Sequence, residues 1–484
     1  MNLKSGAVLA ALLIAFLALQ INLPLRSAIL IGADEGFEVA KATLCLKGYK
    51  LYTDIWNDQP PLHTFLLTEA LRHDSSSMLL PRLITAGFTL LLITAIFFLF
   101  LRLSNLRIAA IATILLIASP GFLLLGSSCM LEIPALAPTI CALCALVFGS
   151  RSRQMFTTLV AGMAFAIALE IKLISLVMLP VAVLLIWICC REEILSGQYF
   201  ARSVLIFAIS SAATTILIDL AVSQGAYLAH FHESWVSHFG RTKSFDYGAP
   251  DDHQFSWIAL LKNWDLSLPA LGGIAICARN LTRAPSMAAP ISWLAYCLLI
   301  FGLHRPWWNY YYVHTTIPLC WCAAIGIDSL WKKVTWPEGR LWCALLALYG
   351  LCAGAWIQER LVGEIQSVQN SPQTYASLFL KQIELYKSQA RWLYTEEPVY
   401  SFHSGIPMPP DLAVLVLKRY WSGEMTNARL AEDLKSFKPE LMLLRNDSNP
   451  RPFRDFINAD YQLIYMDSGN LLYVLKSIVR PEVH

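Results

Sequence analysis

The chain of 484 residues contains 37 basic and 34 acidic residues, so 15% of it is charged, while 56% is hydrophobic. Water-soluble globular proteins are about 25% charged and about 45–50% apolar. The composition therefore excludes a water-soluble enzyme of this size, and a net charge of +3 argues against a nucleic-acid-binding protein. The last 127 residues hold 29 of the charges, which predicts a membrane domain over residues 1–357 and a soluble domain over residues 358–484.

Apolar runs long enough to cross a bilayer recur along the first 357 residues. The hydrocarbon core of a bilayer needs roughly 20 apolar residues in a helix. We predict an α-helical polytopic membrane protein with eleven spans, near residues 6–25, 83–101, 107–126, 132–149, 155–171, 173–190, 203–222, 259–278, 286–303, 309–328 and 341–357. The first run is too long for the core of a signal peptide, so we interpret it as an uncleaved span.

Basic residues in the short loops predict the orientation, because cytoplasmic loops carry an excess of Lys and Arg. With the N-terminus inside, every short inner loop is basic: Lys4, Arg102, Arg107, Arg151, Arg153, Arg191, Arg202, Arg279, Arg283, Lys332, Lys333 and Arg340. An odd number of spans then leaves the C-terminal domain outside, together with a first loop (26–81) and a later loop (223–258).

Ionisable residues that touch the spans fall at one depth. On the predicted topology all of them lie at the outer leaflet: Glu132, Glu170, Lys172, Asp219, His304 and Arg305. Charges near hydrocarbon are costly and usually functional. A transporter more often places such groups at the midplane between repeated halves, and we find no internal repeat. The pattern therefore indicates a polar site at the outer interface.

The first outer loop is the most informative stretch. It places Asp34 and Glu35 directly after a span, and a segment with helical spacing follows them. Such a helix suits a position flat on the membrane surface. The segment Asn57-Asp58-Gln59-Pro60-Pro61-Leu62-His63 follows. Its two prolines cannot continue a helix, and they stiffen the chain that leads to the next one.

The C-terminal domain is predicted to be a small α/β unit. Its β-type runs and helical patterns alternate, and Asp467-Ser468-Gly469-Asn470 is a hairpin turn. Strands are expected at 399–402, 441–444, 462–465 and 471–475, and helices at 411–421 and 427–437. This domain shows no phosphate-binding loop and no catalytic constellation, so we interpret it as a packing or acceptor-binding cap.

The order of these motifs resembles a known family. A span, an Asp-Glu pair, a flat helix, Gly48-x-x-Leu51-Tyr52 and Gln59-Pro60-Pro61-Leu62 are similar to the polyprenyl-phosphate-dependent glycosyltransferases of the GT-C class. The similarity is to the bacterial branch with protein O-mannosyltransferases, aminoarabinose transferases and lipopolysaccharide-core galacturonosyltransferases. Further matching segments are Ser119-Pro120 with Glu132, Ala161-Gly162 through Lys172, and Tyr310-Tyr311-Tyr312 with Pro318.

The resemblance implies an enzyme of the bacterial inner (plasma) membrane that transfers a sugar outside the cytoplasm. The donor would be a polyprenyl-phosphate sugar and the acceptor a lipid, a glycan or a protein, with no nucleic acid involved. The acceptor hydroxyl would attack the anomeric carbon opposite the phosphate and invert it. Asp34 is the candidate base, with Glu35 beside it as a second catalytic candidate. Lys172, His304 and Arg305 are candidates for holding the departing phosphate.

A divalent metal ion is a further possibility that the resemblance raises, because some branches of the class use one. Asp34, Glu132 and His63 could supply ligands, together with Glu35, His230, His232 or His238. Two departures from the pattern are visible. Gln59 stands where aminoarabinose transferases commonly have Lys, which removes a phosphate-binding cation. Glu132 stands where many relatives have Asp.

Each candidate also has a purely structural interpretation. Glu132 could cap a helix, Lys172 could extend to the membrane surface, and Asp58 could shape a turn. Trp307, Trp308 and the three tyrosines after them are typical of an interfacial aromatic belt. At the level of the whole protein, the alternatives are a transporter or flippase of envelope lipids and a non-catalytic membrane scaffold.

Overall fold

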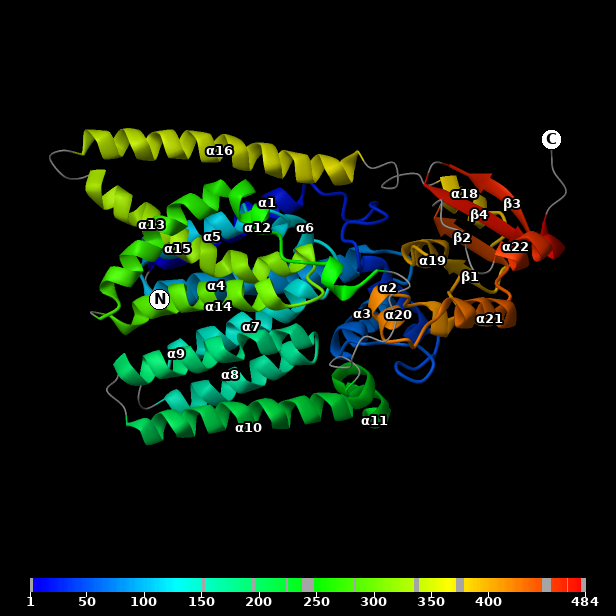
Figure 1. Ribbon diagram of the computed structural model, residues 1–484, viewed down its shortest axis with the longest axis horizontal. Helices are drawn as coiled ribbons and strands as arrows, with labels where there is room; N and C mark the ends of the chain where they lie inside the picture. The colour runs from blue at the N-terminus through cyan, green and yellow to red at the C-terminus, as the bar shows by residue number, and fades with distance from the viewer. Residues whose placement is uncertain are drawn as a thin grey trace.

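The computed structural model consists of a long helical bundle that is joined at one end to a small α/β unit (Figure 1). The N-terminus lies at the far end of the bundle and the C-terminus at the far end of the α/β unit. The structure describes residues 3–149, 153–192, 196–222, 225–236, 248–282, 284–334, 339–370, 378–445, 454–467 and 469–479.

Helices make up nearly all of the bundle and of its outer loops. In chain order they are α1 (Leu3–Gln20), α2 (Glu35–Leu46), α3 (Leu62–His73), α4 (Leu79–Leu103), α5 (Leu106–Ile117), α6 (Phe122–Leu125), α7 (Glu132–Val147), α8 (Gln154–Leu169), η1 (Leu173–Met178), α9 (Leu179–Glu192), α10 (Gly197–Val222), α11 (Tyr227–His230), η2 (Phe231–Val236), η4 (Pro250–Asp252), α12 (Trp257–Lys262), α13 (Trp264–Asn280), η5 (Pro285–Met287), α14 (Ala288–Leu303), η6 (Asn309–Tyr311), α15 (Tyr312–Val334) and α16 (Arg340–Gln369).

Every predicted span contains helix. Seven helical segments in the described part of the chain are long and apolar enough to cross a membrane, and α5, α7 and α8 are shorter apolar helices. The predicted span at 259–278 is divided in two, since α12 ends at Lys262 and α13 begins at Trp264. Asp265 and Pro269 lie within α13, so the interruption falls just before them, at Asn263.

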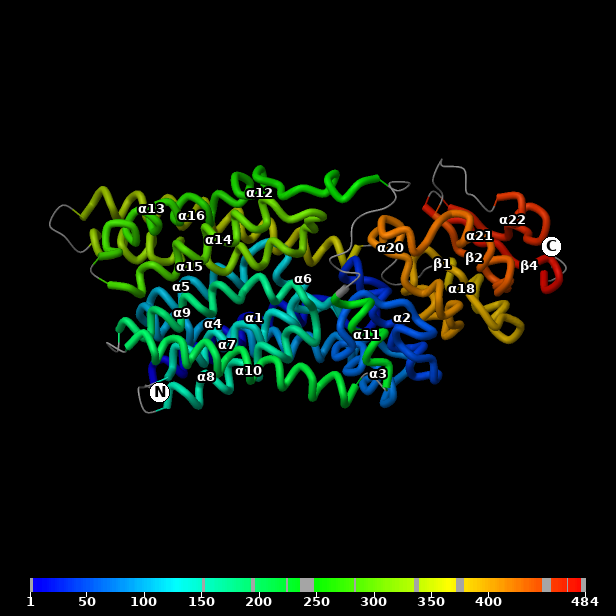
Figure 2. Tube along the Cα trace, turned by 60° about the horizontal axis from the view of Figure 1, so that its bottom comes forward, coloured from blue at the N-terminus to red at the C-terminus, as the bar shows by residue number. Residues whose placement is uncertain are grey.

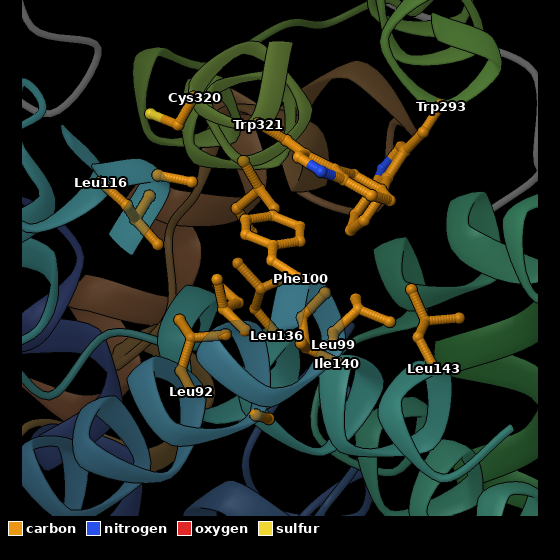
Figure 3. Close-up of a cluster of buried hydrophobic side chains, with 14 of the residues drawn as sticks. Leu92, Leu99, Phe100, Leu116, Leu136, Ile140, Leu143, Trp293, Cys320 and Trp321 are labelled. Atoms are coloured by element: carbon orange, nitrogen blue, oxygen red, sulfur yellow. The ribbon is translucent and has the colours of Figure 1, made fainter. Parts of the chain in front are cut away.

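Small residues let neighbouring helices approach closely. A Cβ atom added at Gly273 of α13 would lie 1.8 Å from the carbonyl oxygen of Cys322 in α15, and one added at Gly162 of α8 would lie 1.9 Å from Ser210 Oγ in α10. Such contacts are typical of helix packing in membranes, where van der Waals contact replaces the hydrophobic effect. The core between them is aromatic: Phe100 stacks on Trp321 with ring centroids 4.6 Å apart, and Trp293 meets Trp321 edge-on (Figure 3).

The α/β unit contains a four-stranded sheet in the order β1-β2-β4-β3. Its elements are α18 (Leu378–Glu384), β1 (Leu393–Thr395), α19 (Val399–Ser404), η7 (Pro410–Leu412), α20 (Leu417–Trp421), α21 (Asn427–Phe437), β2 (Leu441–Arg445), α22 (Arg454–Asp460), β3 (Tyr461–Met466), β4 (Asn470–Leu475) and η8 (Lys476–Ile478). Strand β1 runs parallel to β2, and the other pairs are antiparallel. The predicted hairpin between β3 and β4 is confirmed.

Two predictions in this region were wrong. Residues 399–402 form helix α19, because Pro398 precedes a fully buried run that Gly405 ends at φ 72°, and short apolar runs do not distinguish a buried helix from a strand. The predicted helix at 411–421 is only α20, because its first residues form η7. The boundary at residue 357 falls inside α16, whose charged residues Arg360 and Glu364 still bond to the bundle.

The first outer loop lies between the bundle and the α/β unit. Figure 2 shows α2 and α3 at this junction, with α20 of the α/β unit beside α2. The contact is close, since a Cβ atom at Gly36 would lie 2.8 Å from the backbone nitrogen of Val399. His403 also lies 3.0 Å from the carbonyl oxygen of Ile29 through its Nε2 atom. The α/β unit therefore covers the loop that carries Asp34.

Candidate active site

Four chain segments end at the same level of the bundle and bring polar side chains together. Asp34 is the N-cap residue of α2, Glu132 begins α7, Lys172 precedes η1, and Tyr310 belongs to η6. A helix end leaves polar backbone groups free, so polar side chains are tolerated there even in an apolar bundle. The structure thus gathers three of the predicted site residues, Asp34, Glu132 and Lys172, into one group.

Lys172 and Glu132 form the central ion pair of this group. The Lys172 ammonium bonds to Glu132 Oε1, and both side chains are almost fully buried. The same ammonium lies 4.8 Å from the ring centroid of Tyr310 and 5.3 Å from that of Tyr311. Burial favours the neutral amine, but Glu132 outweighs it and holds the pKa of Lys172 above its ordinary value. A fixed cation is therefore present at the ends of these helices that lie next to the α/β unit.

Asp34 lies against this pair and accepts a hydrogen bond from Tyr310. Burial, followed by the negative charge of Glu132, raises the pKa of the Asp34 carboxyl to about 6, and Lys172 acts in the opposite direction. A carboxyl with a raised pKa accepts a proton more readily than an ordinary aspartate while it is still largely ionised at neutral pH. The geometry therefore suits Asp34 for proton transfer next to a held cation.

Glu35 does not join this group. Its carboxylate pairs with Arg82 of α4 through two hydrogen bonds of 2.8 and 2.9 Å, and both side chains are fully buried. It also accepts hydrogen bonds from the backbone nitrogens of Ile31 and Cys129. Burial favours the neutral acid, but Arg82 outweighs it and holds the pKa of Glu35 below its ordinary value. Glu35 thus ties the first loop to α4, a partner the sequence pattern did not reveal.

A second buried network underlies α2. Glu38 bonds to Lys41 at 2.9 Å and lies 3.3 Å from His63 Nδ1, and Lys41 donates to Asn57 Oδ1 at 3.0 Å. Burial opposes ionisation of Glu38, but Lys41 and His63 prevail and lower its pKa to about 2. His63, a predicted metal ligand, is therefore paired with Glu38 rather than with Asp34 or Glu132.

The double-proline segment contacts the α/β unit. Asp58 pairs with Lys418 of α20 at 3.0 Å. Gln59 contributes its backbone carbonyl, which accepts hydrogen bonds from Tyr52 at 2.8 Å and from Asn57 at 2.7 Å. The side-chain oxygen of Gln59 is buried and has no hydrogen-bond partner among the residues that the structure describes. The α/β unit thus supplies a cation next to the first loop, which the sequence did not indicate.

His304 and Arg305 lie in the turn after α14. Arg305 donates hydrogen bonds to the carbonyl oxygens of Gly302 and His304 at 3.1 and 2.9 Å. The His304 ring lies 6.0 Å from that of Tyr311, and burial followed by the charge of Arg305 lowers the His304 pKa. Both residues border the aromatic wall of the site, and the structure gives neither a contact with Asp34 or Glu132.

The predicted metal ligands are not assembled. Within the described ranges, no group of three or more His, Cys, Asp or Glu side chains could hold a metal ion. Glu132 faces the Lys172 ammonium, and His230 pairs with Asp219 at 2.6 Å. His232 lies beside Glu233, and His238 is outside the described residues. Of the three main candidate ligands, Asp34 and Glu132 belong to one group and His63 belongs to another.

The residues that sequence reasoning missed share one property. Arg82, Lys41 and Glu38 are all buried charged side chains, and each lies within a helix that is otherwise largely apolar. Buried charges are rare unless they are paired, so a charge on an otherwise apolar helix face was the available signal. Tyr310, assigned to an aromatic belt, instead bonds to Asp34.

Comparison with known proteins bears on the fold. The sequence profile of the dolichyl-phosphate-mannose-protein mannosyltransferase family matches residues 61–234, a stretch that contains Glu132 and Lys172 but not Asp34. No curated protein sequence matches the chain at a significant level.

Solved structures match over nearly the whole chain. The crystal structure of ArnT from Cupriavidus metallidurans, bound to undecaprenyl phosphate, superimposes with a TM-score of 0.64 at 13% identity and covers 100% of both chains. The apo oligosaccharyltransferase of Archaeoglobus fulgidus gives a TM-score of 0.59 at 11% identity, over 91% of this chain and 69% of that one. The same enzyme in complex with Zn and sulfate gives 0.56 at 12% identity, over 90% and 68%.

These similarities confirm the resemblance stated from the sequence. At such low identity the structural matches show the fold, and the family profile supports the predicted class of polyprenyl-phosphate-dependent membrane glycosyltransferases. The small C-terminal sheet and the apolar helices agree with the predicted fold class. The chain is therefore a multi-pass membrane protein with the fold of the GT-C glycosyltransferases.

Proposed function

We propose that this protein transfers one sugar from a polyprenyl-phosphate donor to an acceptor hydroxyl at the outer face of the inner membrane. The observation that supports it most is the grouping of Asp34, Glu132 and Lys172 at the outer ends of the apolar helices. A sugar joined through phosphate to a membrane-embedded isoprenoid presents its reactive bond at that level. Undecaprenyl phosphate is the lipid bound in the similar ArnT structure.

In the proposed reaction the acceptor oxygen attacks the anomeric carbon from the face opposite the phosphate. The bond from the acceptor oxygen to carbon forms as the bond from carbon to the phosphate oxygen breaks, and the polyprenyl phosphate leaves with the electron pair. The acceptor proton passes to the Asp34 carboxylate, and the sugar is transferred with inversion. This stereochemistry follows from a single displacement.

Lys172 is the proposed partner of the departing phosphate. Its ammonium is buried and paired with Glu132, so it is held in place before the donor binds. A preorganised cation in a low-dielectric site stabilises developing negative charge more strongly than one in water. We also propose that His304 and Arg305 contact the phosphate. The His304 ring lies near the Tyr311 ring, and Tyr311 in turn lies beside the Lys172 ammonium.

The proposed topology places the N-terminus in the cytoplasm and the α/β unit outside. This topology requires the N-terminus and the α/β unit to lie at opposite ends of the bundle, and Figure 1 shows this arrangement. The α/β unit covers the first loop through Lys418 and Val399, which suits a cap over the acceptor site.

Replacement of Asp34 by Asn tests the proposal. Purified protein in liposomes receives radiolabelled polyprenyl-phosphate sugars and an envelope lipid extract, and glycoside formation is measured. Loss of a general base costs about 10²–10⁴-fold, so D34N is expected to fall by that factor.

The matched control is Asp74→Asn, an exposed aspartate of the same loop, which should keep full activity. Equal transfer by D34N and the parent would refute the role of the base. Movement of lipid across the bilayer by the parent without any glycoside would favour the transporter alternative.

A further inference from the structure

A cavity lies beside the turn that carries Lys172. Its volume is about 430 Å³, and it lies between α8, the segment η1–α9 and α10. Its lining is almost entirely apolar and includes Leu169, Leu176 and Phe207. Ala208, Ala212 and Ile216 also line it and are exposed on α10, so the cavity reaches the side of the bundle.

The helix that forms the outer wall is the edge of the bundle. Only 11% of the apolar window of α10 is buried, against 83% for the segment that contains α15. Figure 1 shows α10 along the edge opposite α16, with α8 and α9 between α10 and the rest of the bundle. A bilayer would therefore place hydrocarbon chains directly at the opening of this cavity.

The outer end of the cavity is polar, because the carboxyl groups of Glu170 and Asp219 and the imidazole of His230 line it. Glu170 is fully buried there, and neither of its carboxyl oxygens has a hydrogen-bond partner in the part of the chain that the structure describes. Asp219 pairs with His230 Nδ1 at 2.6 Å, while His230 Nε2 is also without a partner among the described residues. Buried acceptors without donors are costly, so a ligand that donates hydrogen bonds would be stabilised here.

The charges of this end restrict the ligand. Among the residues that the structure describes, two carboxyl groups and one histidine line the cavity, and no Lys or Arg does. A phosphate would find no cation among these residues, whereas hydroxyl groups can form hydrogen bonds with the carboxyl groups of Glu170 and Asp219. The cavity therefore suits an apolar chain that carries an uncharged headgroup with hydroxyls.

The cavity adjoins the candidate active site. Glu170 and Lys172 lie at the two ends of one turn, and the backbone carbonyl of Glu170 accepts a hydrogen bond from Leu62 after the double proline. Tyr52 packs on His230 with ring centroids 5.0 Å apart and donates its hydroxyl to the Gln59 carbonyl. A headgroup held at Glu170 would thus lie next to the loop that carries the proposed base.

We propose that this cavity binds one hydrocarbon chain of the acceptor and holds its uncharged, hydroxyl-bearing headgroup at Glu170, so that the acceptor is a lipid that enters sideways from the outer leaflet. This inference rests on the proposed function, because it names the class of acceptor for the same active site. The donor phosphate occupies the Lys172 side of the turn, and the acceptor occupies the Glu170 side.

Photolabelling in liposomes tests the binding site. The full-length protein is reconstituted with a diacylglycerol that carries a diazirine in one acyl chain, irradiated, digested and analysed by mass spectrometry. Labels are expected on α8 and α10, within residues 165–169 and 207–216. A phosphatidylglycerol with the same diazirine chain is the anionic comparison and should label these residues at least fivefold less.

Two variants on α10 separate the cavity from the general lipid surface. Ala212→Trp fills the cavity and should reduce labelling at least fivefold, while Ala213→Trp, exposed on the same helix but outside the lining, should leave it unchanged. Equal labelling of the Ala212→Trp variant and the parent would overturn the proposal. So would equal labelling by phosphatidylglycerol.

Glu170→Gln tests the polar end with a second readout. In the transfer assay it should raise KM for the lipid acceptor about tenfold while binding of polyprenyl phosphate stays unchanged. An unchanged KM would remove Glu170 from the acceptor site. If the parent forms no glycoside at all, the proposed function fails, and the labelling result still decides whether the cavity binds lipid.

Discussion

The two polar groups at the end of the bundle that adjoins the α/β unit differ in how their charges are compensated. Around Lys172, the ammonium meets the Glu132 carboxylate and two tyrosine rings, and Asp34 receives a hydrogen bond. Around Glu170, the single histidine, His230, pairs with Asp219, and the Glu170 oxygens have no hydrogen-bond partner among the described residues. In the first group the Glu132 carboxylate is paired with a cation, and in the second the Glu170 carboxyl group has no partner among the described residues.

This difference indicates that the two groups have different functions. A compensated pair in a low-dielectric site is preorganised, so it can respond to charge that develops during a reaction. An acceptor-rich end of an apolar cavity gains most from a ligand that brings hydroxyl groups. One turn of the chain, from Glu170 to Lys172, separates the two, and substitutions on its two sides should have different consequences.

The largest effect is expected from Lys172→Met. It leaves Glu132 buried and unpaired, and removal of one partner of a buried ion pair costs about 3–5 kcal/mol in the free energy of unfolding. Sugar transfer should also fall about 10²–10³-fold, the scale of losing one electrostatic contact to a developing charge. Thermal unfolding in detergent and the transfer assay measure the two effects.

The double variant K172M/E132Q separates the effect on stability from the effect on sugar transfer. It should regain most of the stability, because no unpaired charge is left, and stay inactive. Full transfer by the Lys172→Met single variant would show that the phosphate has another partner.

The next largest effect is expected from a lower pH, which should reduce sugar transfer at the site around Lys172. The pKa of Asp34 is raised to about 6, so its carboxylate is progressively protonated below that pH. A base acts only when deprotonated, so kcat/KM should be near its plateau above pH 7 and fall about tenfold per pH unit below pH 6. A pH–rate profile with a half-point near pH 4 would mean that another group is the base.

Glu170→Leu should not lower the free energy of unfolding, in contrast to Lys172→Met. An apolar residue replaces a buried carboxyl that has no hydrogen-bond partner in the described chain, so the free energy of unfolding should stay level or rise by about 1 kcal/mol. Thermal unfolding beside the Glu132→Leu variant, which frees the Lys172 charge and should be destabilised, makes the test. A similar loss in both variants would mean that Glu170 is compensated.

The smallest effect is expected at the contact between the first loop and the α/β unit. Lys418→Ala removes the cation beside Asp58, and the pair is partly exposed. Such pairs contribute about 0.2–1 kcal/mol, so the thermal midpoint should shift slightly. Transfer should fall less than tenfold, with Lys435→Ala on exposed α21 as the control. A loss as large as that of Lys172→Met would place Lys418 in the catalytic site.

Much of the molecule followed from local patterns. Apolar runs predicted the helices of the bundle, and the excess of charge after residue 357 predicted the α/β unit. The grouping of Asp34, Glu132 and Lys172 was expected, because each comes directly at the end of an apolar segment and all three were assigned to one depth. Depth along a helix can be counted from sequence, since each residue adds about 1.5 Å.

What the sequence could not determine was the partner of each charge. Glu35 and Arg82 are 47 residues apart and meet only because α4 packs beside the first loop, and Lys418 reaches Asp58 across the interface with the α/β unit. Sequence spacing fixes the height of a side chain but not its direction around the helix axis relative to other helices. That direction is set by side-chain packing between distant segments, such as Gly273 against Cys322, so only the tertiary structure separated the site around Lys172 from the cavity beside Glu170.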